Sequence, residues 1–436
     1  MKTLISRAHV DAAKSSLRIE RLENATIRQL VMLINELESL SGESFVRMEL
    51  GVPGLAPASQ AIAAEHAALD SPVVAQYPAL NGNPGLRNAL SEFFSAFMNV
   101  TIESDNCLPT AGSMQASLAA FWLITQIHPK RKKILFLDPG FPTQMQQVKS
   151  LGIEFERIDV FDDQPRRVAE KIRPLLETGE FAGLIYSNPS NPVWNCLTEA
   201  ELSDIAQLCE AFECIALEDL AYFGMDFRED YSKPHQPPYP PSIRHHTDRC
   251  ILLFSGSKLF NYAGQRTGAM LIPESIMNLT SAGLEARFGH SLFRHALLFG
   301  VIQTTTAGLC QSAQAGFEGA LRAMLDGQWN PLEEARAYEQ RAAKLKALML
   351  ANGFEILYGK DNEKPISDGF YFAFGHPAYP EDGLAEALMS FGISATPLTD
   401  AGANQKQGLR ACVGLMTDED LLRIERRLQD FAQAHT

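Results

Sequence analysis

A strand, a turn, a helix and a second strand follow one another in residues 184–222, LIYSNPSNPVWNCLTEAELSDIAQLCEAFECIALEDLAY. Residues 184–187 and 214–217 are short apolar runs, which are typical of strands that are buried on both faces of a sheet. Between them, Thr198 and Glu201 have the spacing of a capping box, in which each side chain satisfies the backbone N–H of the other at the start of a helix. Strands that alternate with helices in this way predict a mostly parallel sheet covered by helices.

The same pattern continues on both sides of this stretch. Residues 134–137 and 251–254 are further short apolar runs, so we expect strands there too. Apolar residues recur at three- and four-residue spacing over residues 16–40, which predicts one amphipathic helix. After residue 307 long helical patterns take over, and two strand-like pieces at 369–374 and 409–414 come before a last helix. We therefore expect an α/β protein with a large central domain and a smaller α+β domain built from both chain ends.

Composition limits the classes of function. The chain has 436 residues, and its formal net charge of −14 disfavours binding to nucleic acid and to anionic membrane surfaces. The best apolar run, residues 116–124, is about half of the roughly 20 residues that a membrane span needs, and the first residues lack the features of a secretory signal. The seven cysteines form no C-x-x-C pair, and no histidine pair has metal-ligand spacing. We expect a cytoplasmic protein with reduced thiols and no metal, nucleic-acid or membrane partner.

Polar residues of different chemical types follow the predicted strands. Because the carboxyl ends of parallel strands meet at one edge of a sheet, ligands bind there, and these residues are expected to form one site. They are Phe141 after the first strand, Asn191 after the second, Asp219 and Tyr222 after the third, and Ser255, Ser257, Lys258 and Arg266 after the fourth, with Gly112, Ser113 and Met114 at the start of an earlier helix.

These residue types suit pyridoxal 5′-phosphate. Lys258 is a single lysine at a strand end and can form a Schiff base with an aldehyde. Arg266, the hydroxyls of Ser255 and Ser257, and the free N–H groups at Gly112-Ser113-Met114 can surround a phosphate.

The opposite end of the same cofactor has its own set of groups. Asp219 can keep a pyridine nitrogen protonated as an ion pair. Tyr222 and Asn191 can bond the phenolic oxygen of the ring, and Phe141 can stack on its face.

The motifs together resemble the class I/II aminotransferases, the aspartate aminotransferase superfamily of pyridoxal phosphate fold type I. The resemblance runs from about Gly51 to the carboxyl terminus. Its motifs, in order, are Tyr77-Pro78 with Gly82 and Gly85, residues 110–116, Asp138-Pro139-Gly140-Phe141-Pro142, Asn188-Pro189-Ser190-Asn191-Pro192, residues 219–222, Ser255-Gly256-Ser257-Lys258 with Arg266, and Arg410. It implies a seven-stranded sheet, with residues 1–60 as an N-terminal segment and part of the small domain, 61–310 as the large cofactor-binding domain and 311–436 as the C-terminal small domain.

The resemblance also implies roles. Lys258, with Asp219 and Tyr222 beside it, would be catalytic: Lys258 would hold the cofactor covalently and move the substrate's α-proton. Arg410 would bind the substrate's α-carboxylate, and Gly51 and Asn191 would contact the same substrate. Tyr77 would reach the phosphate of a neighbouring subunit, which implies a homodimer with a shared active site.

Three features of the sequence depart from the family pattern or are left open by it. Val193-Trp194 stands where the family usually continues Asn-Pro with Thr-Gly, so the contacts of this turn are left open. Gly256 and Thr267 replace larger or aliphatic residues without removing a functional group. Arg287 and Arg294 lie in the region where dicarboxylate-specific relatives carry a second arginine, but no motif selects either.

The expected activity is transfer of an amino group from an L-amino acid to a 2-oxo acid, as in amino acid metabolism. The same cofactor residues would serve a pyridoxal phosphate-dependent lyase or synthase, such as a cysteine-S-conjugate β-lyase. A non-catalytic regulator that binds the cofactor is a third alternative, although only about fifty residues precede Gly51 and they contain no basic recognition helix.

Overall fold

A computed structural model describes residues 3–435, without the side chain of Asn24. Its larger unit is built on a seven-stranded sheet in the order β2-β8-β7-β6-β5-β3-β4. The strands are β2 (Cys107–Thr110), β3 (Lys133–Asp138), β4 (Phe155–Asp159), β5 (Phe181–Ser187), β6 (Ile215–Leu220), β7 (Cys250–Ser255) and β8 (Gly268–Leu271). The pairs from β4 through β3, β5 and β6 to β7 are parallel, and β8 pairs antiparallel with both β7 and β2. The predicted α/β fold class is confirmed.

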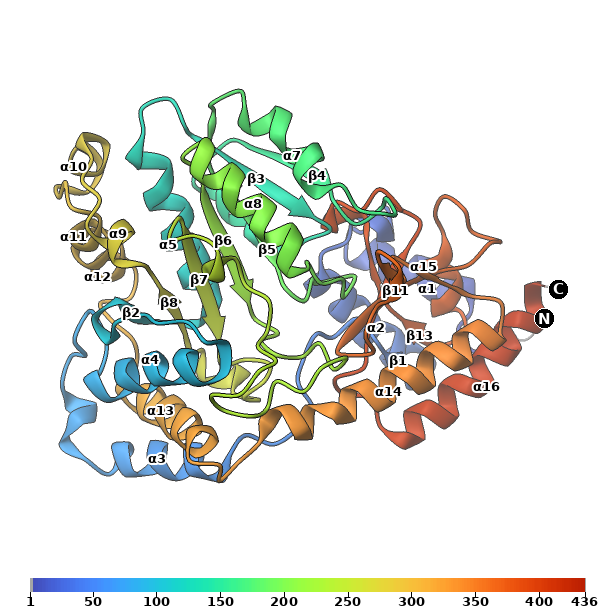
Figure 1. The fold of residues 1–436 in the computed structure, drawn as a ribbon. Helices are drawn as coiled ribbons and strands as arrows, with labels where there is room; N and C mark the ends of the chain where they lie inside the picture. Colours follow the sequence, from blue (N-terminus) through green and yellow to red (C-terminus); the bar gives the residue numbers. More distant parts are fainter. Residues whose placement is uncertain (1–2, 436) are drawn as a thin grey trace.

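Helices cover both faces of this sheet (Figure 1). Ile134 and Phe136 of β3 pack in one apolar cluster with α5 (Gly112–Ile127), whereas Leu135 and Leu137 pack in another on the opposite face. This alternation is the period of two that a strand imposes on its side chains. Because both faces are covered, the central strands β3, β5 and β7 are mostly apolar, which is the pattern that identifies them in the sequence, whereas the edge strand β4 is half-buried and carries charged residues.

Helix α8 (Glu199–Ala211) begins where the capping box predicts. The Thr198 side chain accepts from the backbone N–H of Glu201, and the Glu201 carboxylate accepts from that of Thr198 at 2.8 Å. The other helices on this unit include α3 (Ser59–Leu69), α4 (Pro84–Met98), α6 (Pro142–Ser150) and α7 (Val168–Leu176).

The smaller unit joins the two ends of the chain. Its four-stranded sheet has the order β14-β15-β12-β9, from β9 (Glu355–Leu357), β12 (Tyr371–Gly375), β14 (Thr396–Pro397) and β15 (Leu409–Cys412). A separate pair, β1 (Val46–Arg47) with β13 (Ile393–Ser394), ties the N-terminal segment to it. Figure 1 shows α1 (Arg7–Ser16) and α2 (Ile27–Ser41) beside α15 (Leu384–Met389) and α16 (Asp418–His435), with the long α14 (Pro331–Ala351) running across from the larger unit.

The single helix expected over residues 16–40 is wrong. The chain forms α1 and α2 with a break between Leu17 and Thr26. Thr26 and Gln29 make a capping box that starts a new helix, because each side chain satisfies the backbone N–H of the other.

Helix α13 (Gln311–Leu325) packs against α3 and α4 of the larger unit. Gly316 and Gly319 let it approach α3 closely, since a Cβ at Gly319 would lie 2.9 Å from the carbonyl oxygen of Gln60. We therefore propose that the boundary expected at residue 310 lies between α13 and α14.

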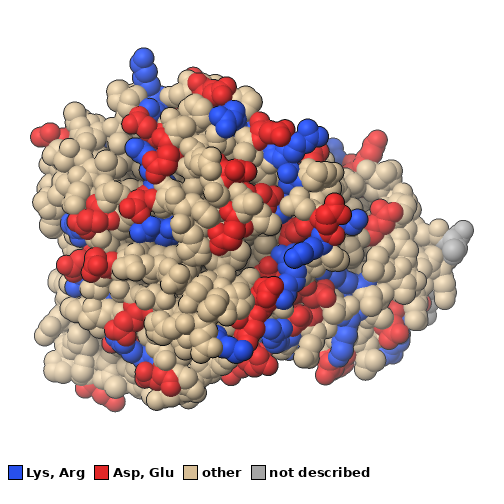
Figure 2. Space-filling model, viewed as in Figure 1, with Lys and Arg blue, Asp and Glu red and all other residues tan. Residues whose placement is uncertain are grey.

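The lengths of the helices and the distribution of surface charge are the remaining features of the fold. Within residues 3–435 no helix combines the length and the apolar composition that crossing a membrane requires. Figure 2 shows acidic and basic side chains interspersed over this face of the molecule.

Candidate active site

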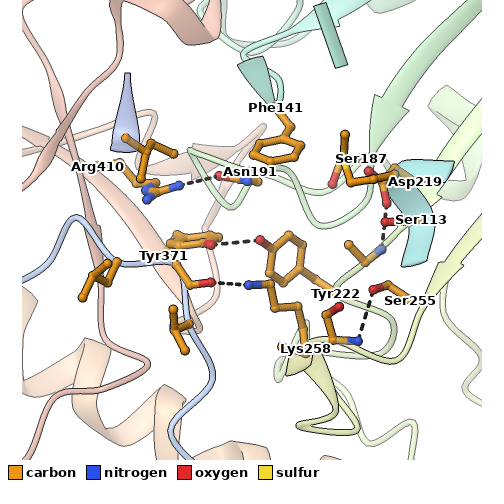
Figure 3. A pocket seen from close by; sticks show the side chains of 18 of the residues that line it. Ser113, Phe141, Ser187, Asn191, Asp219, Tyr222, Ser255, Lys258, Tyr371 and Arg410 are labelled. Atoms are coloured by element: carbon orange, nitrogen blue, oxygen red, sulfur yellow. Dashed lines mark hydrogen bonds between the residues drawn. The ribbon is translucent and has the colours of Figure 1, made fainter. Parts of the chain in front are cut away.

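A cavity of about 370 Å³ lies at the carboxyl ends of β5, β6 and β7, against the smaller unit (Figure 3). The parallel strands β3, β5, β6 and β7 end at this edge, which explains why residues far apart in the sequence meet there. Most of the predicted site residues line it: Gly51, Ser113, Met114, Phe141, Asn191, Asp219, Tyr222, Ser255, Ser257, Lys258, Arg266 and Arg410. Ile27, Leu50, Val52, Ser187, Ala221, Ala263 and Tyr371 complete the lining.

Lys258 extends into this cavity from the loop after β7. Its Nζ donates a hydrogen bond to the carbonyl oxygen of Gly51 and lies 5.2 Å from the centre of the Phe370 ring. Burial lowers the pKa of Lys258 to about 8, and the positive charges of Arg410 and Arg266 act in the same direction. A lysine with a lowered pKa has a larger neutral fraction near pH 7, and the neutral amine is the nucleophilic form.

Asp219 is a buried carboxylate near the end of β6. It accepts from Nε2 of Gln144 at 2.7 Å and from the backbone N–H of Ala221 at 3.0 Å. Burial raises the pKa of Asp219 to about 6, because no nearby cation offsets the loss of water. None of the ion pairs among the described residues includes Asp219, so a cationic group of a ligand in the cavity would find an unpaired partner here.

A second end of the cavity is built to receive an anion. The backbone of Ser113 and Met114 lies in the first turn of the 16-residue helix α5, where free N–H groups and the helix dipole favour negative charge. Arg266 lies beside this turn, with Nη1 3.3 Å from Oγ of Ser257. The Ser255 hydroxyl accepts from the backbone N–H of Ser257 at 3.1 Å.

Gly112 does not line the cavity itself but makes this anion site possible. Its φ of +73° is in the left-handed region, and a Cβ there would lie 2.8 Å from Nη2 of Arg266. Only glycine therefore lets the guanidinium approach the start of α5.

Arg410 is a buried cation on β15. Its Nη2 donates to the carbonyl oxygen of Glu49 at 2.8 Å and to Oγ1 of Thr396 at 3.2 Å, and its Nη1 donates to Oδ1 of Asn191 at 3.2 Å. No carboxylate pairs with it among the ion pairs of the described residues, and its Nε has no hydrogen-bond partner. A buried guanidinium held only by neutral groups suits a carboxylate ligand, which it can bind bidentately.

Three predicted or considered residues lie elsewhere. Tyr77 does not line the cavity, and its side chain is 93% exposed in this single chain. Arg287 lies over the ring of Trp122, and Arg294 bonds Asn106 and Glu274, so neither lines the cavity of its own chain.

Sequence reasoning missed Gln144, Tyr371 and the role of Trp194. Gln144 is a buried polar residue in the first turn of α6 and holds Asp219. Trp194 is fully buried, with its ring edge-to-face on Tyr222 at a centroid distance of 5.3 Å. The unusual Val193-Trp194 pair was a visible signal for Trp194, whereas nothing in the strand pattern of residues 369–374 distinguishes Tyr371 from its neighbours.

Comparison with known proteins shows which proteins this chain is similar to. The family model "Aminotransferase class I and II" matches residues 46–428. A probable aspartate aminotransferase of Methanocaldococcus jannaschii is 24% identical over 243 residues, which are 56% of this chain and 61% of that protein. A valine–pyruvate aminotransferase of Mycobacterium tuberculosis is 26% identical over 52% of this chain and 56% of its own. The chain thus spans about three-fifths of the length of the curated relatives it matches.

Solved structures extend the likeness over the whole fold. An aminotransferase from Mycobacterium tuberculosis superposes with a TM-score of 0.75 at 19% identity, covering 94% of this chain and 96% of the other. Aspartate aminotransferase from Thermus thermophilus with maleate has a TM-score of 0.72 at 19% identity, covering 98% of this chain and 97% of the other. At this identity the superposition establishes a shared fold.

Proposed function

The chain belongs to the family of class I and II aminotransferases, and from that premise we propose that it is a pyridoxal phosphate-dependent aminotransferase. It would transfer the amino group of an L-amino acid to a 2-oxo acid. One observation carries the proposal: Lys258, Asp219 and Arg410 converge on one cavity, and neither the carboxylate nor the guanidinium has a charged partner among residues 3–435.

The residues present fit pyridoxal phosphate. Its phosphate matches the anion site of Ser113, Met114, Ser255, Ser257 and Arg266, beside Gly112. Bound there, the cofactor supplies an electron sink for the charge that develops at the substrate's α-carbon.

The remaining contacts suit the ring. Asp219 would pair with its protonated nitrogen, which supplies the cationic partner that this buried carboxylate lacks. Asn191 and Tyr222 would donate to its phenolic oxygen, and Phe141 lies at the cavity wall as a flat apolar surface for its face.

Substrate handling follows from the groups that remain. Arg410 would bind the α-carboxylate, with Asn191 and the backbone of Gly51 beside it. Lys258 Nζ, which bonds the Gly51 carbonyl oxygen, would take the substrate's α-proton once its amine is free. A pKa near 8 suits this role, because a base works best when its pKa is close to the operating pH.

We also propose a homodimer in the cytoplasm. Tyr77, at 93% exposure, is free to reach a neighbouring subunit, as the family resemblance implies. The seven cysteines are free thiols, six of them buried, which supports a reducing compartment. A molar mass of twice 48.1 kDa by light scattering would support the dimer, and a monomer at assay concentration would contradict it.

A lyase or synthase on the same residues is the second candidate and is not favoured, because the curated relatives carry aminotransferase names. The test is the absorption spectrum of cofactor-loaded protein titrated in turn with L-glutamate, L-aspartate, L-phenylalanine and L-alanine. We expect one of them to convert the visible band to that of the amine form of the cofactor. Release of ammonia without a 2-oxo acid acceptor would instead support a lyase, and absence of any visible band would contradict the role of Lys258.

A further inference from the structure

Tyr371 connects two parts of the candidate site. It begins β12 opposite Cys412 of β15 and is fully buried. Its hydroxyl lies 3.0 Å from that of Tyr222, and its ring centre lies 4.4 Å from Cζ of Arg410 (Figure 3). One side chain therefore contacts both a residue expected at the cofactor ring and the residue expected at the substrate carboxylate.

The two hydroxyls can form a chain of donors. Burial raises the pKa of Tyr371 to about 12 and that of Tyr222 well above its ordinary value, so both stay protonated at neutral pH. One proton is used between the two oxygens, and a hydroxyl that accepts one hydrogen bond can still donate another. In this structure Tyr222 donates to Tyr371. A hydroxyl proton can rotate, so when a ligand's phenolic oxygen offers Tyr222 another acceptor, Tyr371 can donate to Tyr222 and the proton of Tyr222 can point into the cavity.

The surroundings hold this pair in place. The Trp194 ring lies edge-to-face on Tyr222 and on Tyr371, with centroid distances of 5.3 and 6.0 Å. Tyr371 also closes on Gly51, where an added Cβ would collide with its hydroxyl. Such confinement limits the rotations open to both tyrosines, which is what positioning requires.

We propose that Tyr371 is a positioning residue with two separable parts. Its hydroxyl orients Tyr222, so that Tyr222 donates to the phenolic oxygen of bound pyridoxal phosphate. Its ring supports the guanidinium of Arg410 for the substrate's α-carboxylate through a cation–π contact. This inference rests on the proposed function and adds a residue to it.

The charged and titratable groups around the pair are few. Arg410 and Cys412 face it from β15, and Lys258, in the loop after β7, bonds the carbonyl oxygen of Gly51, against which Tyr371 packs. Trp194 and Phe370 pack against it without charge. If removing one hydroxyl changes the pH titration of the cofactor-loaded protein, the change can therefore be assigned to the phenolic oxygen of the cofactor or to Lys258.

The experiment compares Tyr371→Phe, which removes only the hydroxyl, with Tyr371→Leu, which removes the ring as well. In Tyr371→Phe, Tyr222 keeps its proton but loses the hydrogen bond that orients it and strengthens its donation. The phenolic oxygen then becomes more basic, so the pH midpoint of the visible band of loaded protein should rise by up to about one unit. We expect kcat to fall about three- to tenfold and the KM for the amino acid to stay unchanged. Tyr371→Leu should show the same raised pH midpoint as Tyr371→Phe. In addition, its KM for the amino acid should rise about tenfold, because the ring that supports Arg410 is lost.

Tyr358→Phe is the matched control, because Tyr358 is also a buried tyrosine but its hydroxyl bonds Asp159 outside the cavity. It should leave the midpoint and KM as in the wild type. Tyr371→Met is measured as a second variant that removes the ring. Because methionine fills the space with a longer side chain, it serves if Tyr371→Leu does not fold.

The outcomes distinguish a failure of the proposal for Tyr371 from a failure of the proposed function. An unchanged midpoint in Tyr371→Phe would overturn the hydroxyl role, and an unchanged KM in both Tyr371→Leu and Tyr371→Met would overturn the ring role. If wild-type protein itself shows no visible band with the cofactor, the proposed function fails before Tyr371 is tested.

Discussion

At the scale of single residues, burial rather than local sequence sets the chemistry of the candidate site. Lys258 and Asp219 have their pKa values moved toward neutrality, to about 8 and about 6, by loss of contact with water. Groups perturbed in this way, gathered in one cavity, are typical of functional sites. Burial of these two groups also destabilises the protein when no ligand is bound, and this loss of stability can be measured.

Lys258→Ala removes the amine that would bind the cofactor and move the proton. We expect turnover to fall by about 10⁴-fold or more, because both roles are lost together. Cofactor should still bind, more weakly, through the anion site, and equilibrium dialysis measures this. Lys132→Ala, which removes a lysine bonded to the carbonyl oxygen of Thr125, is the control and should keep full activity. Wild-type turnover in Lys258→Ala would disprove the assignment.

Asp219→Asn tests the pH dependence of stability. A carboxyl whose pKa is raised by folding favours the folded state at low pH, and this contribution is lost as the pH rises through about 6. At pH 8 the cofactor-free protein thus carries an unfavourable buried charge that asparagine lacks. We expect Asp219→Asn to melt at or above the wild-type temperature at pH 8, with a smaller difference at pH 5.5, while turnover falls about 10²-fold or more.

The control for this comparison is Asp418→Asn, whose side chain is exposed at the start of α16 and should leave both melting temperatures unchanged. A melting temperature for Asp219→Asn that lies further below wild type at pH 8 than at pH 5.5 would contradict the sign of the argument.

At the scale of elements, the turn after β5 and the start of β12 depend on each other. Trp194 has a φ of +69° and packs its indole against Gly369, the residue that leads into β12. A methyl group at position 369 would collide with the indole ring, so only glycine fits there. Through this contact the loop that carries Asn191 is held against the strand that carries Tyr371.

Gly369→Ala should therefore destabilise the protein by about 1–3 kcal/mol, as overpacking of a core does. Chemical denaturation measures the free energy of unfolding, and visible absorption of loaded protein reports whether Tyr222, on which Trp194 packs, is displaced. Gly264→Ala is the control, because a Cβ there meets nothing within 4 Å. Partial rescue by adding Trp194→Phe would support the contact, and equal effects of the two glycine variants would refute it.

At the scale of the whole molecule, a buried network of charges joins segments far apart in the chain. Asp361 of β10 (Lys360–Asp361) accepts from Arg166 at 3.0 Å and pairs with Arg228 at 2.9 Å, and it also accepts from Nδ2 of Asn195 at 2.9 Å. The Arg166 side chain has no exposure to solvent. Without Asp361, Arg166 would keep Glu201 and Arg228 would keep Asp226 as partners, but the buried N–H groups of Arg166 and Cys196 that bond Asp361 would lose their acceptor.

We expect Asp361→Ala to lower the free energy of unfolding by about 1–3 kcal/mol, because these buried donors are left without an acceptor. Asp382→Ala breaks the exposed pair with Arg21 and should cost about 1 kcal/mol or less. Urea denaturation measures the free energy of unfolding of both variants. Similar decreases in the two would show that the buried network stabilises the protein no more than an exposed ion pair does.

The sequence by itself determined the class of fold and most of the candidate site. Short apolar runs predicted β3, β5, β6 and β7, because strands covered on both faces have few polar side chains to interrupt them. They did not predict β2, β4 or β8. Lys258, Asp219 and Arg266 were predictable because parallel strands bring their carboxyl ends to one edge, so residues that follow different strands share a site.

Only the tertiary structure decided the features that depend on contacts between distant segments. Tyr371 is an ordinary strand residue until its hydroxyl meets Tyr222, which is 149 positions away, and Gln144 is an ordinary helix residue until it meets Asp219. Local patterns report which face of an element is apolar, but not which side chain of another element will lie opposite. That pairing is set by packing, and here packing supplies the positions of the groups around the cavity.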